Sequence, residues 1–198
     1  VLAVAGAVVL SAAAQANVNN FTFKDFTGDY YLSRDDEGRA NLRVVETFTA
    51  EFPADRDQNK GITRAIPDRY EGNPTSFQFE SLKRNGQTEP VYSQERNGDD
   101  MIIASGTEEF LRGDQTYELT YTLRDVIRDS GSYQEFYWDT VGTTSSQPFG
   151  DVVGRVHLDE SVRDLFQGDI ACFQGSRDSG DECANVAREG DTITFSSM

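Results

Sequence analysis

Apolar and polar side chains alternate along most of this 198-residue chain, and this alternation restricts the fold more than any other feature. In the clearest stretch one set of alternate positions is apolar, namely Tyr117, Leu119, Tyr121 and Leu123. The positions between them hold threonines and charged residues. Successive side chains of a strand point to opposite sides of a sheet, so a period of two indicates one buried and one solvated face. This stretch is therefore predicted to be a long, half-buried strand.

The same pattern recurs along the chain, with turn signals such as Asn85-Gly86 and Asn97-Gly98 between the segments. Further strands are expected within residues 42–52, 62–66, 77–79, 101–103, 133–141, 152–158 and 193–195. A helical period is confined to the short piece from Ser161 to Phe166. Many short strands that each bury one face predict an all-β fold, a two-sheet antiparallel β-sandwich of the immunoglobulin-like kind.

Residues 1–16 carry no charge and end in the small residues Ala14-Gln-Ala16. A short apolar run before small residues is typical of a signal peptide, and the remnant of a membrane anchor is the alternative interpretation. Residues 17–198 are then expected to form one extracytoplasmic β-sandwich domain, since no linker divides them. Attachment to the cell membrane in the full-length protein would come from segments outside this chain.

Two cysteines, Cys172 and Cys183, flank a loop rich in Gly, Ser and Asp. In an oxidising compartment such a pair is predicted to form a structural disulfide. A catalytic redox pair would more naturally have the Cys-x-x-Cys spacing, which is absent.

Two charged residues interrupt the apolar faces of their strands. Glu46 shares a face with Leu42, Val44 and Phe48, and Arg64 shares a face with Ile62 and Ile66. An unpaired charge in a core costs several kcal/mol, so we expect the two to form a buried, hydrogen-bonded ion pair. The alternative is a bulge or strand end that lets one of them reach water.

The chain has 18 lysines and arginines against 34 aspartates and glutamates, a net charge of −16. This balance argues against a nucleic-acid partner, because phosphate binding needs a cationic face. The simplest role for the acidity is solubility, and attraction for a cation or a basic partner is the functional alternative.

No catalytic residue is predicted. The single histidine, His157, is expected to face solvent on a strand, and no Ser or Cys motif accompanies it. No cofactor or metal is expected, since one histidine and two bridged cysteines make a poor zinc site. Calcium at two acidic turns is the weaker alternative, with Asp35, Asp36 and Glu37 in one turn and Asn97, Asp99 and Asp100 in the other.

A carbohydrate site is the second alternative. Glu135 and Asp139 flank Trp138 on one predicted strand, and an aromatic ring beside two carboxylates suits sugar binding or hydrolysis. The opposing interpretation places Phe136 and Trp138 in the core and the acids in solvent. A concave pocket that joins Glu135 or Asp139 with a second carboxylate would favour the carbohydrate interpretation.

Several strings, taken in order, resemble the DUF2207 family of predicted bacterial membrane proteins. They include Leu42-Arg-Val-Val-Glu46, Asn59-Lys-Gly-Ile-Thr-Arg-Ala-Ile-Pro67, Gln134-Glu-Phe-Tyr-Trp-Asp139 and Gln147-Pro-Phe149. The segment Ala171-Cys-Phe-Gln-Gly175 with Cys183 is similar to the actinobacterial branch. The resemblance implies an exported β-rich domain attached to transmembrane helices, and it brings no catalytic or ligand-binding residues.

Together these features predict a non-catalytic extracytoplasmic module of an envelope membrane protein, with a structural or interaction role. Its partner would be an unidentified protein or a cell-envelope component. The alternative is a carbohydrate-active or carbohydrate-binding domain that uses the Glu135, Trp138 and Asp139 strand.

Overall fold

The computed structural model describes residues 18–197 except 71–72, 143–144, 146 and 176–178. The expected signal or anchor segment, residues 1–16, lies outside this range. The described chain is almost entirely strand, with antiparallel sheets packed together, which confirms the all-β prediction. The immunoglobulin-like subtype stays a prediction.

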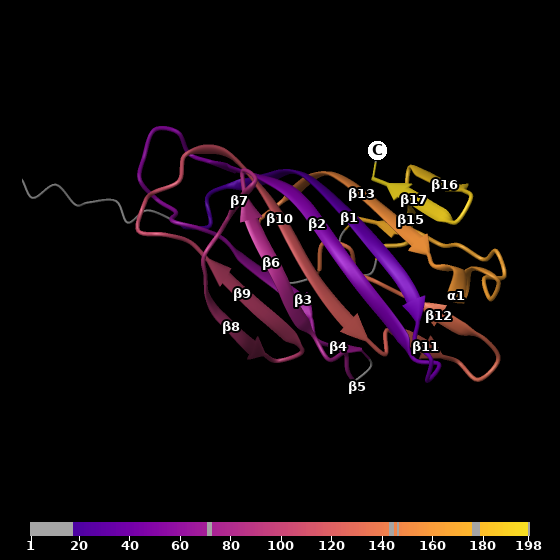
Figure 1. Ribbon diagram of the computed structural model, residues 1–198. Coiled ribbons are helices and arrows are strands. Elements are labelled where there is room, and N and C mark those ends of the chain that lie inside the picture. The colour runs from indigo at the N-terminus through magenta and orange to yellow at the C-terminus, as the bar shows by residue number, and fades with distance from the viewer. Residues whose placement is uncertain (1–17, 71–72, 143–144, 146, 176–178, 198) are drawn as a thin grey trace, which may run out of the picture.

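One layer is a long eight-stranded sheet (Figure 1). Its strand order is β16-β17-β13-β1-β2-β10-β6-β7. The bounds in that order are Asn185–Glu189, Thr192–Ser196, Phe149–Leu158, Thr22–Arg34, Ala40–Phe52, Gly113–Arg124, Gln78–Arg84 and Gln87–Thr88. The central strands β1, β2 and β10 are the longest, and they supply most of the core.

The second layer is a three-stranded sheet of order β3-β9-β8, at the lower left of Figure 1. Its strands are Thr63–Pro67, Asp100–Ser105 and Val91–Asn97. Short pairs complete the fold: β4 (Arg69–Tyr70) with β5 (Asn73–Pro74), β11 (Ile127–Asp129) with β12 (Gln134–Phe136), and β14 (Phe173–Gln174) with β15 (Asp181–Glu182). The single turn of helix α1, Glu160–Arg163, overlaps the predicted piece Ser161 to Phe166, starting one residue earlier, and is capped by the Asp159 side chain.

One strand pair departs from the antiparallel expectation. β13 runs parallel to β1, in a register that extends from Phe23 opposite Phe149 to Leu32 opposite Leu158. A tight hairpin joins only antiparallel strands, so parallel neighbours must be separated by a long connection, and β2 to β12 lie between these two. Apolar and polar side chains alternate in the same way in parallel and in antiparallel strands. The alternation therefore does not indicate in which direction two strands pair.

The core follows the predicted alternation. On β2 the inward set is buried at every second position from Leu42 to Phe52, and on β10 the inward set is Tyr117, Leu119, Tyr121 and Leu123. On β1 a register shift between Phe23 and Asp25 lets both Phe23 and Phe26 face the core.

Within the described part of the chain, no helix is long and apolar enough to span a membrane.

The predicted strand over residues 133–141 is wrong beyond Phe136. Only Gln134–Phe136 pairs as a strand, opposite Ile127–Asp129. The chain after Phe136 leaves the sheet, and the carbonyl groups of Thr140 and Val141 instead accept hydrogen bonds from the side chain of Arg64. The guanidinium of Arg64 thus supplies the hydrogen-bond donors that a neighbouring strand would otherwise provide.

Candidate functional site

Glu46 and Arg64 meet between the two layers as a buried ion pair. Arg64 donates from Nε to Glu46 Oε2 at 2.7 Å and from Nη2 to Oε1 at 2.9 Å. The Glu46 side chain is 0% exposed and that of Arg64 is 9% exposed. Two parallel bonds between a guanidinium and a carboxylate give the strongest and most directional form of such a pair.

The remaining donors of Arg64 hold the chain around it. Nη1 donates to the carbonyl oxygens of Ala65 at 2.8 Å and Val141 at 3.0 Å, and Nη2 also donates to Thr140 at 3.3 Å. The guanidinium lies 5.6 Å from the centre of the Phe26 ring. Arg64 therefore links the small sheet, the large sheet and the segment after β12.

Two tyrosines extend this network. The Tyr121 hydroxyl donates to Glu46 Oε1 at 2.9 Å, and the Tyr30 hydroxyl donates to the Thr140 carbonyl at 3.4 Å. Burial, reinforced by the Glu46 carboxylate, raises the pKa of both phenols above the ordinary value. Burial alone would lower the pKa of Arg64, but the adjacent carboxylate raises it above its usual range. Tyr30 and Tyr121 are thus neutral donors around a charged pair.

A glycine makes room for the network. Gly28 lies directly opposite Glu46 in the β1–β2 register. A Cβ atom at this position would lie 2.4 Å from the Tyr30 hydroxyl oxygen and 2.7 Å from ring carbons. The absent side chain lets the Tyr30 ring lie along its own strand toward Thr140.

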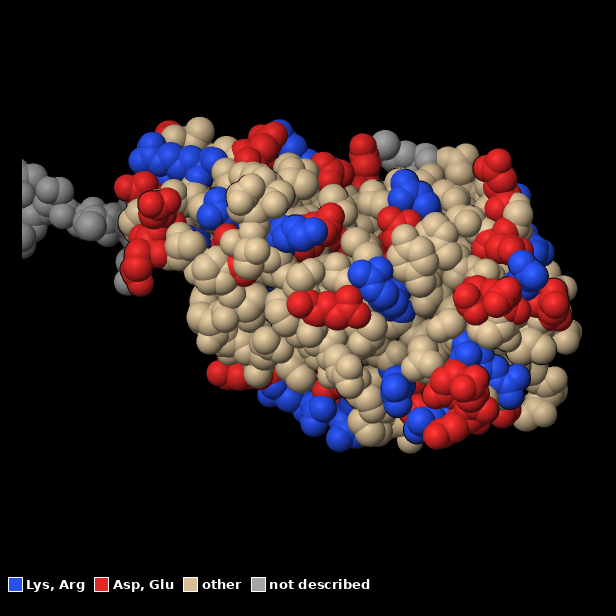
Figure 2. All heavy atoms as spheres, viewed as in Figure 1, with Lys and Arg blue, Asp and Glu red and all other residues tan. Residues whose placement is uncertain are grey.

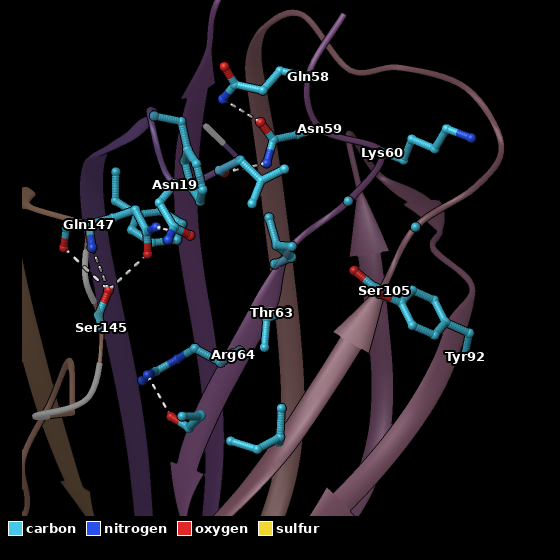
Figure 3. Close-up of a pocket in the computed structure, with 18 of the residues that line it drawn as sticks. Asn19, Gln58, Asn59, Lys60, Thr63, Arg64, Tyr92, Ser105, Ser145 and Gln147 are labelled. Atoms are coloured by element: carbon cyan, nitrogen blue, oxygen red, sulfur yellow. Dashed lines mark hydrogen bonds between the residues drawn. The ribbon is translucent and has the colours of Figure 1, made fainter. Parts of the chain in front are cut away.

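A groove of about 1070 Å³ opens beside this network (Figure 3). Thr63 and Arg64 of β3 lie in its middle. Asn19, Ser145 and Gln147 lie on one side of β3, and Lys60, Ser105 and Tyr92 lie on the other. The groove is therefore built from the start of the small sheet and from loops that are far apart in the sequence.

The sequence analysis did not identify this groove. Its buried amide side chains include Gln58 and Asn59, and although Asn59 begins one of the family-like strings, that string carries no ligand-binding role; Tyr92 lies on an edge strand. The one available signal was Tyr92 itself, an aromatic residue directly before the polar run Ser93 to Asn97.

Cys172 and Cys183 form a disulfide, with their Cα atoms 5.4 Å apart. The Cys183 amide also donates to the Cys172 carbonyl at 3.0 Å, next to the β14–β15 pair. The bridge closes a surface hairpin away from the groove lining. The disulfide therefore has a local structural role, joining the two ends of this hairpin.

The structure separates the predicted carbohydrate-site residues. Glu135 lies on β12, whereas Trp138 and Asp139 follow that strand. The rings of Phe136 and Trp138 pack against the core in a stacked pair, so the Trp138 ring is not an exposed platform. Asp139 accepts a hydrogen bond from the Tyr137 hydroxyl at 3.2 Å, and Glu135 lies 4.0 Å from Arg128.

His157 faces the outer side of the large sheet, but it is not simply solvated. Its Nε2 lies 2.8 Å from Asp29 Oδ1, and its Nδ1 lies 3.2 Å from the Thr192 hydroxyl. The ring stacks on Tyr31 at 4.5 Å, and Arg155 also donates to Asp29. These contacts join the strands β1, β13 and β17 on that face.

The two acidic turns have ordinary backbone roles. The Asp35 carboxylate accepts from the amides of Glu37 and Arg39, and these backbone bonds lower the pKa of Asp35. In the second turn, Asp99 accepts the Asp68 amide through its carbonyl oxygen. Among the described residues, no group of three or more His, Cys, Asp or Glu side chains is placed to hold a metal ion.

Charges of both signs are interspersed on the face shown in Figure 2, without a large patch of one sign. Residues in the large sheet contribute several exposed ion pairs of this kind, such as Lys24 with Asp114 and Lys83 with Glu118. Pairs at such exposed positions add little to stability.

Comparison with solved structures supports the fold. Yeast LTA4 hydrolase in complex with Bestatin aligns with a TM-score of 0.51 at 8% identity, over 91% of this chain and 27% of that chain. Native yeast LTA4 hydrolase aligns with a TM-score of 0.52 at 7% identity, over 92% and 27%. An M1 zinc metallopeptidase from Deinococcus radiodurans aligns with a TM-score of 0.45 at 12% identity, over 89% and 38%.

This chain thus spans about a quarter of the yeast enzyme, and the likeness concerns the fold alone. No curated protein sequence matches the chain. Residues 24–195, however, match the family described as "Predicted membrane protein (DUF2207) N-terminal domain". The match covers nearly all of the described residues, and the chain therefore belongs to the DUF2207 family, as the N-terminal domain of a predicted membrane protein.

Proposed function

We propose that this chain is a non-catalytic extracytoplasmic module of a bacterial envelope membrane protein, with a structural or interaction role. The observation that carries the proposal is the Glu46–Arg64 network. Both oxygens of Glu46 accept hydrogen bonds from Arg64, and the guanidinium also binds three backbone carbonyls. This buried ion pair between the layers thus holds them together, and both oxygens of Glu46 are occupied as acceptors, which leaves neither free to take a substrate proton.

The extracytoplasmic placement draws on the disulfide. Cys172 and Cys183 are the only cysteines of the chain, and they are paired. Disulfides persist in oxidising compartments and are rare in the cytosol of mesophiles. The family description as a membrane protein agrees with an envelope location.

Cysteine labelling in intact cells tests the placement. The full-length protein would carry Tyr133→Cys, because Tyr133 is 61% exposed and distant in sequence from the native pair. We expect a membrane-impermeant maleimide to label this variant in intact cells. The unsubstituted protein is the control, because both cysteines of this chain are bridged. Labelling that occurs only after lysis would contradict the placement.

A pull-down tests the interaction role. The folded domain is immobilised and exposed to a detergent extract of the envelope, with a disulfide-reduced sample as the comparison. We expect the oxidised domain to enrich the same envelope component in independent extracts. Turnover of a glycan or peptide substrate by the purified domain, abolished by Glu135→Gln or Asp139→Asn, would instead support an enzyme.

A further inference from the structure

We propose that the groove beside β3 binds an uncharged saccharide chain. This inference rests on the proposed function, since it names the chemical class of ligand that the module would recognise in the envelope. It moves the carbohydrate hypothesis from Glu135, Trp138 and Asp139 to a different part of the molecule. Three properties of the groove carry it: charge balance, exposed aromatic rings and prearranged amide groups.

The groove lining is electrically balanced in an otherwise acidic chain. Its charged residues are two cations, Lys60 and Arg64, and two anions, Asp100 and Glu108. Lys60 is paired with Glu108 at 2.9 Å, and Arg64 is paired with Glu46. With a net charge of −16 over the whole chain, a neutral groove favours an uncharged ligand over a polyanion, which the rest of the surface repels.

Two exposed aromatic rings line the same groove. Tyr92 is 72% exposed, the largest exposure among the large hydrophobic residues of the described chain, and Phe110 is 47% exposed. The Lys60 ammonium lies 5.2 Å from the centre of the Phe110 ring, which holds that ring at the rim. A flat ring with a polar tip offers an apolar face to the C–H groups of a sugar and a hydroxyl to its polar edge.

The polar groups of the groove are held in place before any ligand arrives. Gln58 donates to Asn59 Oδ1 at 2.9 Å, and Asn59 donates to the Val18 carbonyl at 2.8 Å, and both side chains are buried. Ser105, 2% exposed, lines the groove with a hydroxyl that has no partner among the described residues. Fixed amides and a spare hydroxyl suit ligand hydroxyl groups, which both donate and accept.

An extended peptide fits the groove less well. A peptide that adds to a sheet needs an open strand edge. The edge of β3 that faces away from β9 is already flanked, because the Arg64 side chain binds the carbonyls of Thr140 and Val141 there. A Cβ atom on Gly142 would lie 3.8 Å from the Ala65 carbonyl oxygen. Along β3 the groove therefore offers side chains and rings rather than an unpaired strand edge, and the other edge strand of this sheet is β8, which carries Tyr92.

Titration calorimetry with defined probes tests the inference. The purified domain is titrated with chitotetraose, cellotetraose and maltotetraose as neutral probes, and with tetragalacturonate as the anionic probe. We expect at least one neutral probe to bind and the anionic probe not to bind. Tyr92→Ala should weaken binding about tenfold, as expected for loss of one aromatic contact. Tyr133→Ala is the matched control, an exposed tyrosine outside the groove, and should leave binding unchanged.

Absence of binding by all three neutral probes at millimolar concentration would overturn the inference, as would binding that Tyr92→Ala leaves intact. Tyr92 is mostly solvated, so its replacement is not expected to unfold the domain, and circular dichroism verifies this. A protein partner that the pull-down captures with the wild type but not with Tyr92→Ala would make the groove a protein site and also overturn the inference. If the pull-down captures the same partner with the wild type and with Tyr92→Ala, and no saccharide binds in the titrations, the saccharide inference fails. The proposed interaction role is then still supported.

Discussion

Two buried glutamates, Glu46 and Glu89, are paired with arginines in different parts of the molecule. Glu46 lies between the layers, where Arg64 binds both of its oxygens and Tyr121 donates a further hydrogen bond. Glu89 lies after β7 at the margin of the large sheet, where Arg84 binds Oε2 at 2.9 Å. The other oxygen of Glu89 is buried without a partner in the described part of the chain.

The two arginines also differ in their access to water. The side chain of Arg64 is 9% exposed, and that of Arg84 is 21% exposed. An enclosed pair must satisfy nearly all of its donors and acceptors within the protein, because no solvent can replace a missing bond. At the margin only the arginine reaches water, because the Glu89 side chain is 2% exposed. The more enclosed arginine is therefore found with the more completely hydrogen-bonded glutamate.

Removal of Arg64 is the strongest test of this comparison. We expect Arg64→Ala to lower the free energy of unfolding by about 3–5 kcal/mol, because it leaves a buried carboxylate unpaired. The carbonyls of Thr140 and Val141 also lose their donor. Chemical denaturation monitored by circular dichroism measures the change.

The double variant Glu46→Gln with Arg64→Met is the control for the charge itself. Because it removes both charges and keeps an acceptor for Tyr121, it should be more stable than Arg64→Ala alone. A melting temperature of Arg64→Ala equal to that of the wild type would refute the enclosed pair.

Removal of Arg84 sharpens the comparison with a smaller effect. We expect Arg84→Ala to cost about 1–3 kcal/mol, the penalty for a buried group left without its partner, since water can reach the vacated position. Exposed Lys24, paired with Asp114, serves as the control, and Lys24→Ala should leave the unfolding midpoint unchanged. A loss for Arg84→Ala as large as that for Arg64→Ala would show that enclosure does not matter.

Alkaline pH tests the tyrosines beside the two glutamates. Burial, together with the nearby carboxylate, raises the pKa of Tyr121 beside Glu46 and of Tyr117 beside Glu89. A raised pKa in the folded state contributes stability that is complete below the unfolded pKa of 10.0 and is lost as pH rises above it. We expect a loss of about 1.4 kcal/mol per pH unit for each buried tyrosine once pH exceeds the unfolded value.

Unfolding midpoints from about pH 9 to 11 measure this slope. Tyr121→Phe and Tyr117→Phe should each make it shallower, and Tyr133→Phe, at an exposed position, should not. Equal slopes in all four proteins would contradict the assignment.

The strand pattern was readable from the sequence because alternation is a local property. The inward sets of β2 and β10 follow it directly, and the turn residues Asn85 and Gly86 have the positive φ angles that a tight hairpin requires. The inward positions of Glu46 and Arg64 were readable for the same reason. Arg84 and Glu89 were not singled out, because neither interrupts a clear apolar face in the sequence.

The predicted strand over 133–141 was wrong after Phe136, where contacts with residues distant in the sequence determine the backbone conformation. Residues 137–141 are mostly aromatic or β-branched, types that favour strands, yet the carbonyls of Thr140 and Val141 accept hydrogen bonds from Arg64 instead of pairing with a neighbouring strand. Trp138 consequently packs inward, and the carbohydrate site expected at Glu135 and Asp139 is not assembled around an exposed ring. A local pattern cannot report a partner that lies far away in the sequence.

The sequence by itself determined the all-β class, the inward faces of the long strands, and the two charged residues that had to be accommodated in the core, because these depend on spacing along a few consecutive residues. The tertiary structure alone decided the parallel pairing of β1 with β13, the carbonyl partners of Arg64, and the groove that brings Asn59, Tyr92 and Ser105 together. These features join residues from separate segments, and which segments meet is set by the packing of the whole chain.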